Sequence, residues 1–214
     1  MSILKKYYNR ENAEYGITSS RTKKIMDFFE GIRGKKVLDV GCAGGYLGKR
    51  VKDLGNEVSG IDISYVSIKE SEKVLDKAFV VDIQEENFPF EANYFDIVIL
   101  SEVIEHLFFP EIALEKIKMV LKENGKLIIT TPNLLVFSNR IRILFGYFEY
   151  TEKGIIIPEH IRFFSHDSLV KFLKKNGFKV MRENNIIHPK IPEFLGNIFP
   201  NLFSYQMVIE FQLE

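Results

Sequence analysis

The segment VLDVGCAGGYLG, from Val37 to Gly48, decides how this chain of 214 residues folds. An aliphatic run ends at Asp39-Val40, a glycine-dense turn follows, and a segment with helical character comes next. Because glycine has no Cβ, it lets the backbone turn sharply out of a strand and lets a ligand approach the main chain. The segment therefore predicts a strand, a ligand-binding loop and a helix, in that order.

The glycine spacing separates two families that bind nucleoside-type cofactors with such a loop. Dinucleotide-binding folds require G-x-G-x-x-G, in which the second glycine admits the pyrophosphate. Here those positions are Gly41, Ala43 and Tyr46, so two of the three glycines are missing. Taken from Asp39 as D-x-G-x-x-x-G, the segment resembles motif I of the class I S-adenosylmethionine-dependent methyltransferases. The usual form of that motif is D/E-x-G-x-G-x-G, and this segment differs from it at Ala43. A strand, turn and helix that bind no ligand are the alternative interpretation.

Four more strand patterns follow in the order that this family uses, so the resemblance extends over residues 35–214. We expect these strands at 57–62, 78–83, 94–101 and 126–133. The first of them ends at Asp62, where the resemblance implies hydrogen bonds to both ribose hydroxyls, although an aspartate there can also cap a helix. The next ends near Asp82, where the family contacts the adenine amino group.

The resemblance implies S-adenosylmethionine as the cofactor and S-adenosylhomocysteine as its product. The residues that it assigns to cofactor binding are Asp39, Gly41, Cys42, Ala43, Gly45, Asp62, Ile63, Asp82, Ile83 and Ser101. Within this set we interpret Cys42 as a small loop residue without a chemical role.

Helical patterns alternate with the strands at 20–31, 46–54, 65–75 and 111–121, and a serine-capped helix runs from Ser165 to Asn176-Gly177. Two last strands are expected at 178–183 and 202–213. Such alternation indicates parallel β-α-β units with right-handed crossovers. The resemblance implies an α/β fold, a Rossmann-like three-layer sandwich. Its seven-stranded, mostly parallel sheet has the order 3-2-1-4-5-7-6, with strand 7 antiparallel.

The composition predicts one domain over residues 1–214, with an N-terminal helical segment at 1–34 and an inserted substrate cap at 134–164. Lys+Arg and Asp+Glu both total 29, so no overall charge attracts nucleic acid. The single cysteine and the lack of a signal-peptide pattern predict a reducing, cytoplasmic location. No stretch reaches the roughly 20 apolar residues of a membrane-spanning helix.

The segment 134–164 is too long for an ordinary connection, which predicts a lid. Apolar residues recur along it at helical spacing: Leu134, Phe137, Ile141, Leu144, Phe145 and Phe148. We expect this stripe to be half-buried over the active site, and its aromatic content indicates an apolar or ring-bearing small-molecule acceptor. Two alternatives are a basic amphipathic helix that lies on a membrane surface through 134–148, and a helix that completes the core.

Glu102, Glu105 and His106 share one face if a helix begins near Ser101, and His160 could join them from the lid. This E-x-x-E-H pattern resembles that of ubiquinone-pathway O-methyltransferases and of small-RNA 3'-terminal 2'-O-methyltransferases, in which the matching residues ligate a metal. Oxygen-rich ligation favours Mg²⁺ or Mn²⁺. Such an ion would lower the pKa of an acceptor hydroxyl and orient it. The alternative is a metal-free pair that packs beneath the cofactor.

Without a metal, His160 or His106 is the natural general base, because an unperturbed imidazole titrates near neutrality. His160 is favoured because it lies where the lid returns to the body. A hydrogen-bonded packing role is the alternative for either histidine. His166 is expected at the surface and His188 in a loop, and neither is assigned a role.

These features predict an S-adenosylmethionine-dependent methyltransferase that acts on a small-molecule acceptor, at a hydroxyl group. One alternative is an RNA 3'-terminal 2'-O-methyltransferase, suggested by E-x-x-E-H and Thr131-Pro132-Asn133. The neutral net charge and the apolar lid argue against a polyanionic substrate. The other alternative is a non-catalytic protein that keeps the cofactor pocket and regulates a partner.

Overall fold

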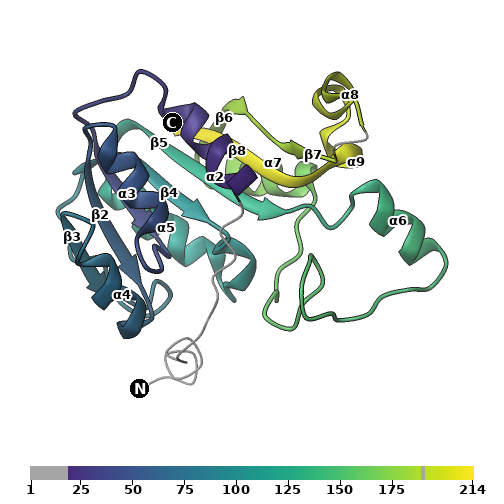
Figure 1. The fold of residues 1–214 in the computed structure, drawn as a ribbon, viewed down its shortest axis with the longest axis horizontal. Helices are drawn as coiled ribbons and strands as arrows, with labels where there is room; N and C mark the ends of the chain where they lie inside the picture. Colours follow the sequence, from purple (N-terminus) through teal and green to yellow (C-terminus); the bar gives the residue numbers. More distant parts are fainter. Residues whose placement is uncertain (1–18, 189–190) are drawn as a thin grey trace.

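The computed structural model describes residues 19–188 and 191–214, and one mixed sheet runs through it (Figure 1). Within the described residues the sheet has eight strands: β1 (Lys36–Val40), β2 (Glu57–Asp62), β3 (Lys77–Val80), β4 (Phe95–Ser101), β5 (Leu121–Pro132), β6 (Phe178–Glu183), β7 (Ile186–Ile187) and β8 (Ser204–Leu213). The predicted N-terminal segment 1–34 falls partly on residues 1–18, which lie outside the described residues. That the whole chain is one domain stays a prediction.

The strand order across the sheet is β3-β2-β1-β4-β5-β8-β6, and β7 pairs with β8 beside that path. Strands β1 to β5 are parallel to one another, whereas β8 is antiparallel to both β5 and β6. The predicted order is therefore confirmed, with β8 in the place of strand 7. The additional strand β7 has only two residues.

Helices cover both faces of the sheet, which confirms the three-layer prediction (Figure 1). One face carries α2 (Ser19–Met26), the 3₁₀ turn η1 (Asp27–Phe29), α3 (Tyr46–Asp53) and α4 (Tyr65–Ser71); the other carries α5 (Pro110–Val120) and α7 (His166–Lys175). Successive side chains of β1 point to opposite faces of the sheet, because side chains alternate along a strand with a period of two residues. Val37 belongs to the same core cluster as Ile25 of α2, whereas Leu38 belongs to that of Leu114 on α5.

Some boundaries differ from the prediction. Helix α4 ends at Ser71 rather than at residue 75, and β5 already begins at Leu121 rather than at residue 126. Strand β3 ends at Val80 rather than at residue 83. The Val81 amide still donates to the Asp62 carbonyl at 2.9 Å, and after it the chain turns away from the sheet. The turn places Asp82 at the sheet edge where the site forms.

Segment 134–164 leaves the layers after β5 and contains the helix α6 (Phe137–Leu144) (Figure 1). No residue of α6 is buried, and every residue from Ile141 to Tyr150 is exposed, including Leu144 at 75% and Phe145 at 72%. The prediction of a half-buried stripe is therefore wrong. The helix extends past the sheet, and the contacts that hold it at its base are polar.

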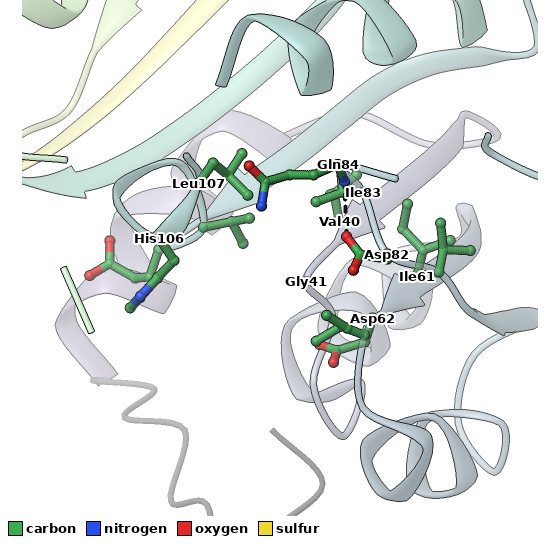
Figure 2. A pocket seen from close by; sticks show the side chains of 13 residues that line it. Val40, Gly41, Ile61, Asp62, Asp82, Ile83, Gln84, His106 and Leu107 are labelled. Atoms are coloured by element: carbon green, nitrogen blue, oxygen red, sulfur yellow. Dashed lines mark hydrogen bonds between the residues drawn. The ribbon is translucent and has the colours of Figure 1, made fainter. Parts of the chain in front are cut away.

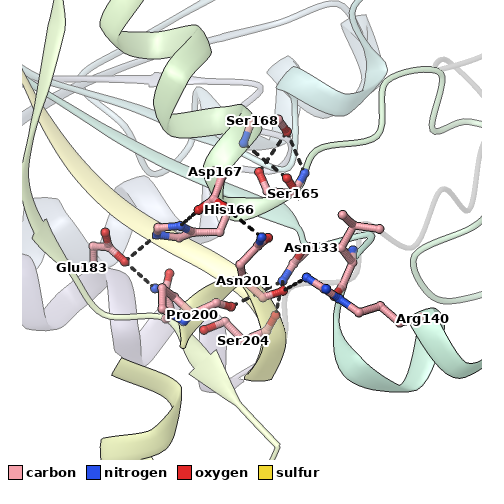
Figure 3. A network of polar contacts seen from close by, with 12 residues as sticks. Asn133, Arg140, Ser165, His166, Asp167, Ser168, Glu183, Pro200, Asn201 and Ser204 are labelled. Carbon is pink, nitrogen blue, oxygen red and sulfur yellow. Dashed lines mark hydrogen bonds and ion pairs between the residues drawn. The ribbon is translucent and has the colours of Figure 1, made fainter. Parts of the chain in front are cut away.

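Asn133 and Arg140 make those polar contacts (Figure 3). The Asn133 Nδ2 group donates to the Ser204 carbonyl at 2.7 Å and to the Asn201 carbonyl at 3.3 Å. Arg140 Nη2 donates to the same Asn201 carbonyl at 3.2 Å. Asn201 lies on α9 (Pro200–Phe203), which follows α8 (Glu193–Ile198). The lid is thus fastened to α9 through backbone oxygens rather than through an apolar interface.

His166 is buried rather than exposed at the start of α7, so its predicted surface position is wrong (Figure 3). Its Nε2 lies 2.9 Å from Glu183 Oε2 on β6, and its Nδ1 lies 3.2 Å from Asp167 Oδ1. Burial alone would lower the pKa of His166, but the Glu183 and Asp167 carboxylates raise it above its ordinary value. His166 therefore ties α7 to β6. Among the described residues, no helix has the length and apolar character needed to cross a bilayer.

Candidate functional site

The site lies at the carboxyl ends of the parallel strands, where the strand order reverses between β1 and β4. A pocket opens there, and Figure 2 shows Asp62 and Asp82 on one side of it and His106 on the other. Of the predicted cofactor residues, those that line this pocket are Gly41, Asp62, Ile63, Asp82 and Ile83. Those that support it without lining it are Asp39, Cys42, Ala43, Gly45 and Ser101.

The glycine loop has the backbone that its sequence requires. Gly41 has φ of 74°, and a Cβ at this position would clash with the Val103 side chain across the pocket. Ala43, where the family usually has glycine, also lies in the left-handed region with φ of 46°. Alanine tolerates that conformation at a cost of about 1–2 kcal/mol. The Ala43 amide donates to Asp62 Oδ2 at 2.9 Å, which ties the loop to the end of β2.

Asp62 and Asp82, the two aspartates of the pocket, differ in how many of their carboxylate oxygens accept a hydrogen bond from the protein. Asp62 accepts backbone hydrogen bonds at both oxygens, from Ala43 and from Ser64 at 2.8 Å, and burial raises the pKa of its carboxyl. Each oxygen keeps a second lone pair for a ligand hydroxyl. Asp82 Oδ1 accepts from the Gln84 amide at 3.1 Å. Its buried Oδ2 has no hydrogen-bond partner among the described residues, so it fits a donor supplied by a ligand.

Asp39 lies beneath the loop rather than in the pocket. Its carboxyl is buried, and Oδ2 has no hydrogen-bond partner within the described part of the chain. Burial, and then the charge of Asp62, raise the pKa of Asp39 to about 7. The neighbouring Cys42 thiol packs against Gly60, and burial raises its pKa well above the ordinary value. A thiol that stays protonated agrees with the packing role predicted for Cys42.

The side of the pocket that carries His106 departs from the predicted helix. Glu102 has φ of 57°, so the chain cannot continue from Ser101 into a helix, and only a 3₁₀ turn, η2 (Ile104–His106), forms. The expectation that Glu102, Glu105 and His106 share one helical face is therefore wrong. Glu102 pairs instead with Arg21 of α2, its Oε2 3.1 Å from Nη1. Glu102 is not among the residues whose potential ligand atoms lie within 4.8 Å of one another.

The remaining three predicted ligands do come together. Potential ligand atoms of Glu105, His106 and His160 all lie within 4.8 Å of one another. The lid return reaches Glu105 through its backbone, because the amides of Ile161 and Arg162 both donate to the Glu105 carbonyl, at 3.0 and 2.9 Å. The two imidazole rings meet edge to face with centroids 4.9 Å apart. We call these three residues the Glu105 cluster.

Both histidines of the Glu105 cluster are oriented by backbone carbonyls. Nδ1 of His106 lies 2.9 Å from the Glu159 carbonyl, and Nδ1 of His160 lies 2.8 Å from the Ile155 carbonyl. Because a carbonyl only accepts, Nδ1 carries the proton in each ring and Nε2 keeps a lone pair. Burial, and then His160, lower the pKa of His106 to about 4. His106 is therefore a weak base at neutral pH but a suitable neutral ligand.

Glu105 supplies the chemical test of whether the cluster fits a cation. Its side chain is 1% exposed, and neither carboxyl oxygen has a hydrogen-bond partner among the described residues. Burial, and then the Glu102 charge, raise its pKa well above the ordinary value. A buried carboxyl without a partner is costly, and a cation between it and two imidazole lone pairs would remove that cost. The cluster therefore fits a divalent cation.

Sequence reasoning missed two residues that shape this side of the site, Arg21 and Gln206. Gln206 Nε2 donates to Glu102 Oε1 at 2.5 Å from 104 positions away in the sequence. Arg21 reaches Glu102 from the N-terminal helix. Neither residue belongs to a local motif, so no spacing in the sequence could have indicated them.

Comparison with known proteins gives a consistent assignment. The family model described as "Methyltransferase domain" matches residues 9–183. The mitochondrial ubiquinone biosynthesis O-methyltransferase of Mus musculus is 35% identical over 161 residues, which cover 70% of this chain and 42% of that protein. The ubiquinone biosynthesis O-methyltransferase of Idiomarina loihiensis is 28% identical over 178 residues, covering 80% of this chain and 72% of that protein. The chain thus spans less than half of the mouse protein.

Solved structures share the fold at low sequence identity. Magnesium protoporphyrin IX methyltransferase from Synechocystis PCC 6803, with bound SAH, aligns with a TM-score of 0.65 at 17% identity, covering 91% of this chain and 83% of that one. An S-adenosylmethionine-dependent methyltransferase from Aquifex aeolicus aligns with a TM-score of 0.63 at 20% identity, covering 90% and 89%. These likenesses concern the fold.

Proposed function

Because the chain belongs to the class I S-adenosylmethionine-dependent methyltransferase family, we propose that it methylates a hydroxyl group of a small-molecule acceptor. The observation that carries the proposal is the pocket lined by both Asp82 and His106. Asp82 Oδ2 has no hydrogen-bond donor among the described residues, and His106 belongs to the Glu105 cluster. One side binds the cofactor and the other receives the acceptor. The relatives named as O-methyltransferases support oxygen as the acceptor atom.

In this proposal the residues at the strand ends bind and orient the cofactor. Asp62 accepts from the ribose hydroxyls through its remaining lone pairs, and Asp82 Oδ2 accepts from the adenine amino group. Gly41 leaves room for the close approach. The bound S-adenosylmethionine supplies an already activated methyl group, so the protein contributes mainly by alignment of the acceptor.

We further propose that Glu105, His106 and His160 hold a divalent cation. Because Glu102 is not part of the cluster, the donor set holds one carboxylate and two imidazoles rather than the oxygen-rich set predicted from the sequence. Imidazole donors suit Mn²⁺ better than Mg²⁺, which prefers oxygen ligands. A cation there would lower the pKa of an acceptor hydroxyl. Without a cation, His160 is the better placed proton acceptor, since the pKa of His106 is lowered to about 4.

We propose that the acceptor is apolar and that residues 134–148 of the lid contact a membrane surface. Leu144 and Phe145 are largely exposed, so they are available to an apolar partner. The same stretch contains Arg140 and Arg142 and no acidic residue, which favours an anionic surface. The lid would then receive the acceptor at the end of the molecule that carries α6. The RNA alternative gains no specific support, because the chain has no net charge and the lid is mostly apolar.

Calorimetric titration with S-adenosylmethionine and S-adenosylhomocysteine tests the cofactor assignment. We expect both to bind, and we expect Asp62→Ala to weaken binding because it removes the ribose contact and the anchor of the Ala43 amide. Asp96→Asn is the matched control, since Asp96 is an aspartate of β4 that contacts Lys36 and Lys122 away from the pocket. No binding by the wild-type protein would refute the proposal.

The acceptor class is tested by methyl transfer to a panel of phenols, catechols and short RNA oligonucleotides, with mass spectrometry of the products. We expect methylated oxygen on a phenolic or catecholic acceptor with an apolar substituent. Transfer to RNA alone would replace the small-molecule proposal with the RNA alternative. Cofactor binding without transfer to any acceptor would favour the non-catalytic alternative.

A further inference from the structure

Glu102 occupies an unusual position at the end of β4. Its φ of 57° lies in the left-handed region, which a glutamate adopts only when its surroundings hold it there. Its Oε1 accepts from Thr130 Oγ1 at 2.8 Å and from Gln206 Nε2 at 2.5 Å. Its Oε2 lies 3.1 Å from Arg21 Nη1. Three elements, β5, β8 and α2, therefore hold this carboxylate in one orientation.

The Arg21 contact differs from the other two because it carries charge. The side chains of Arg21 and Glu102 are 12% and 22% exposed, so solvent screens this ion pair less than a surface pair. Thr130 and Gln206 donate neutral hydrogen bonds to the opposite oxygen. Arg21 is thus the partner that opposes a movement of Oε2 toward another cation.

The Glu105 cluster is the place where another cation would bind. Glu102 lines the same pocket as His106 of the Glu105 cluster, so its carboxylate lies beside the place where the cation would bind. Yet the cluster within 4.8 Å contains Glu105, His106 and His160 without Glu102. Glu102 therefore borders the Glu105 cluster without belonging to it.

We propose that Arg21 is a positioning residue that holds Glu102 out of the Glu105 cluster. The proposal rests on the cation site of the proposed function. By engaging Oε2, Arg21 limits the protein to three ligands, which leaves a coordination position for the acceptor hydroxyl. Helix α2 thereby sets how strongly the protein binds the cation. Loss of Arg21 frees Glu102 to add a fourth ligand, so it strengthens cation binding.

The test is calorimetric titration with Mn²⁺ of the wild-type protein, Arg21→Ala and the double variant Arg21→Ala/Glu102→Gln. We expect Arg21→Ala to bind Mn²⁺ about tenfold more tightly, within the range seen when groups around a metal site are changed. The double variant should return to wild-type affinity, because its amide cannot replace the carboxylate ligand. Electron paramagnetic resonance of bound Mn²⁺ should change between wild type and Arg21→Ala as the ligand set changes.

Lys24→Ala is the matched control on the same helix. Lys24 forms an ion pair with Glu193 at 3.2 Å and a hydrogen bond to Asn184, and it does not contact Glu102. Its removal should leave Mn²⁺ affinity unchanged, even though α2 also loses a tertiary contact. If thermal unfolding shows that Arg21→Ala does not fold, Arg21→Gln keeps most of the side chain and replaces it in every titration.

Mn²⁺ affinity of the Arg21 variant that is equal to or weaker than that of wild type overturns the proposal. So does a double variant that keeps the tighter binding, because Glu102 would then not be the added ligand. An electron paramagnetic resonance spectrum that stays the same in Arg21→Ala also overturns it, because relief of charge alone would then explain tighter binding. Titration of Arg21→Ala with S-adenosylhomocysteine shows whether the positioning role of Arg21 fails alone or together with the proposed methyltransferase function. Unchanged cofactor binding with unchanged Mn²⁺ affinity rejects the positioning role and leaves the methyltransferase proposal intact.

Discussion

The side of the pocket proposed to bind the cofactor (the cofactor side) and the side proposed to receive the acceptor (the acceptor side) are built by contacts of very different range. On the cofactor side, Ala43 binds Asp62 across 19 positions and Gln84 binds Asp82 across two. On the acceptor side, His106 reaches the Glu159 carbonyl across 53 positions and Glu102 meets Gln206 across 104. Consecutive strands and turns therefore assemble the cofactor side, whereas the acceptor side depends on the lid, the N-terminal helix and the last strand.

The two sides also differ in burial. Asp39, Asp62 and Asp82 are all buried beneath or beside the glycine loop, and the pocket wall around them is continuous with the core. In the lid, every residue from Ile141 to Tyr150 is exposed, and the helix α6 has no buried residue. This difference indicates a cofactor site that is formed in advance and an acceptor site whose cover can adapt to its ligand. Each prediction below tests that contrast.

The largest effect is expected from Gly41→Ala, which should lower the affinity for S-adenosylhomocysteine about 100-fold, or about 2.8 kcal/mol. The added methyl group would clash with the Val103 side chain, so the loop or Val103 must shift in the wall of the pocket. Gly31→Ala is the matched control, because Gly31 has the same φ of 74° with nothing within 4 Å of the added Cβ. Calorimetry should show normal binding by Gly31→Ala; an equal loss in both variants would mean that backbone strain, not the contact, matters.

A smaller effect is expected from the pH dependence of stability. The folded protein holds a proton on Asp39 with a pKa of about 7, whereas the ordinary value is 3.8. Between these two values the unfolded chain has lost that proton and the folded protein still holds it, so stability falls as pH rises through this window, by up to about 1.4 kcal/mol per pH unit. Urea unfolding of Asp39→Asn should show a flatter slope than that of wild type.

Asp96→Asn provides the control for that slope. Burial alone would raise the pKa of Asp96, but the Lys36 amide and Lys122 hold it below its ordinary value. Asp96 is therefore already ionised in both states over the same window, and its replacement should leave the slope as in wild type. A slope that Asp39→Asn does not flatten would assign the pH dependence to the other buried carboxyls, Asp62 and Glu105, whose pKa values are also raised.

The smallest effect on stability is expected in the lid. Leu144→Ser should change the free energy of unfolding by no more than about 0.5 kcal/mol, because the side chain is 75% exposed. Val136→Ser, at the buried base of the same segment, should cost clearly more. Leu144→Ser should nevertheless raise KM for an apolar acceptor and leave cofactor affinity unchanged. A large loss of stability in Leu144→Ser would show that the lid packs on the body in solution.

The sequence by itself determined the fold and the cofactor side of this protein. Gly41, Asp62 and Asp82 follow strands whose apolar patterns are local, and parallel strands bring their carboxyl ends to one edge of the sheet. The strand order followed from the family resemblance that these motifs established. Even Ala43, which departs from the usual motif, keeps the left-handed backbone that the loop requires.

Only the tertiary structure decided the acceptor side. The helix expected from Ser101 fails because Glu102 is held in a left-handed conformation by partners from distant elements, Arg21 and Gln206. The apolar period of the lid predicted α6 correctly as a helix, but a period cannot tell whether a partner surface exists to bury it. Motif spacing reports what adjacent residues impose on one another, whereas the Glu105 cluster and the exposed lid depend on which distant segments meet in space.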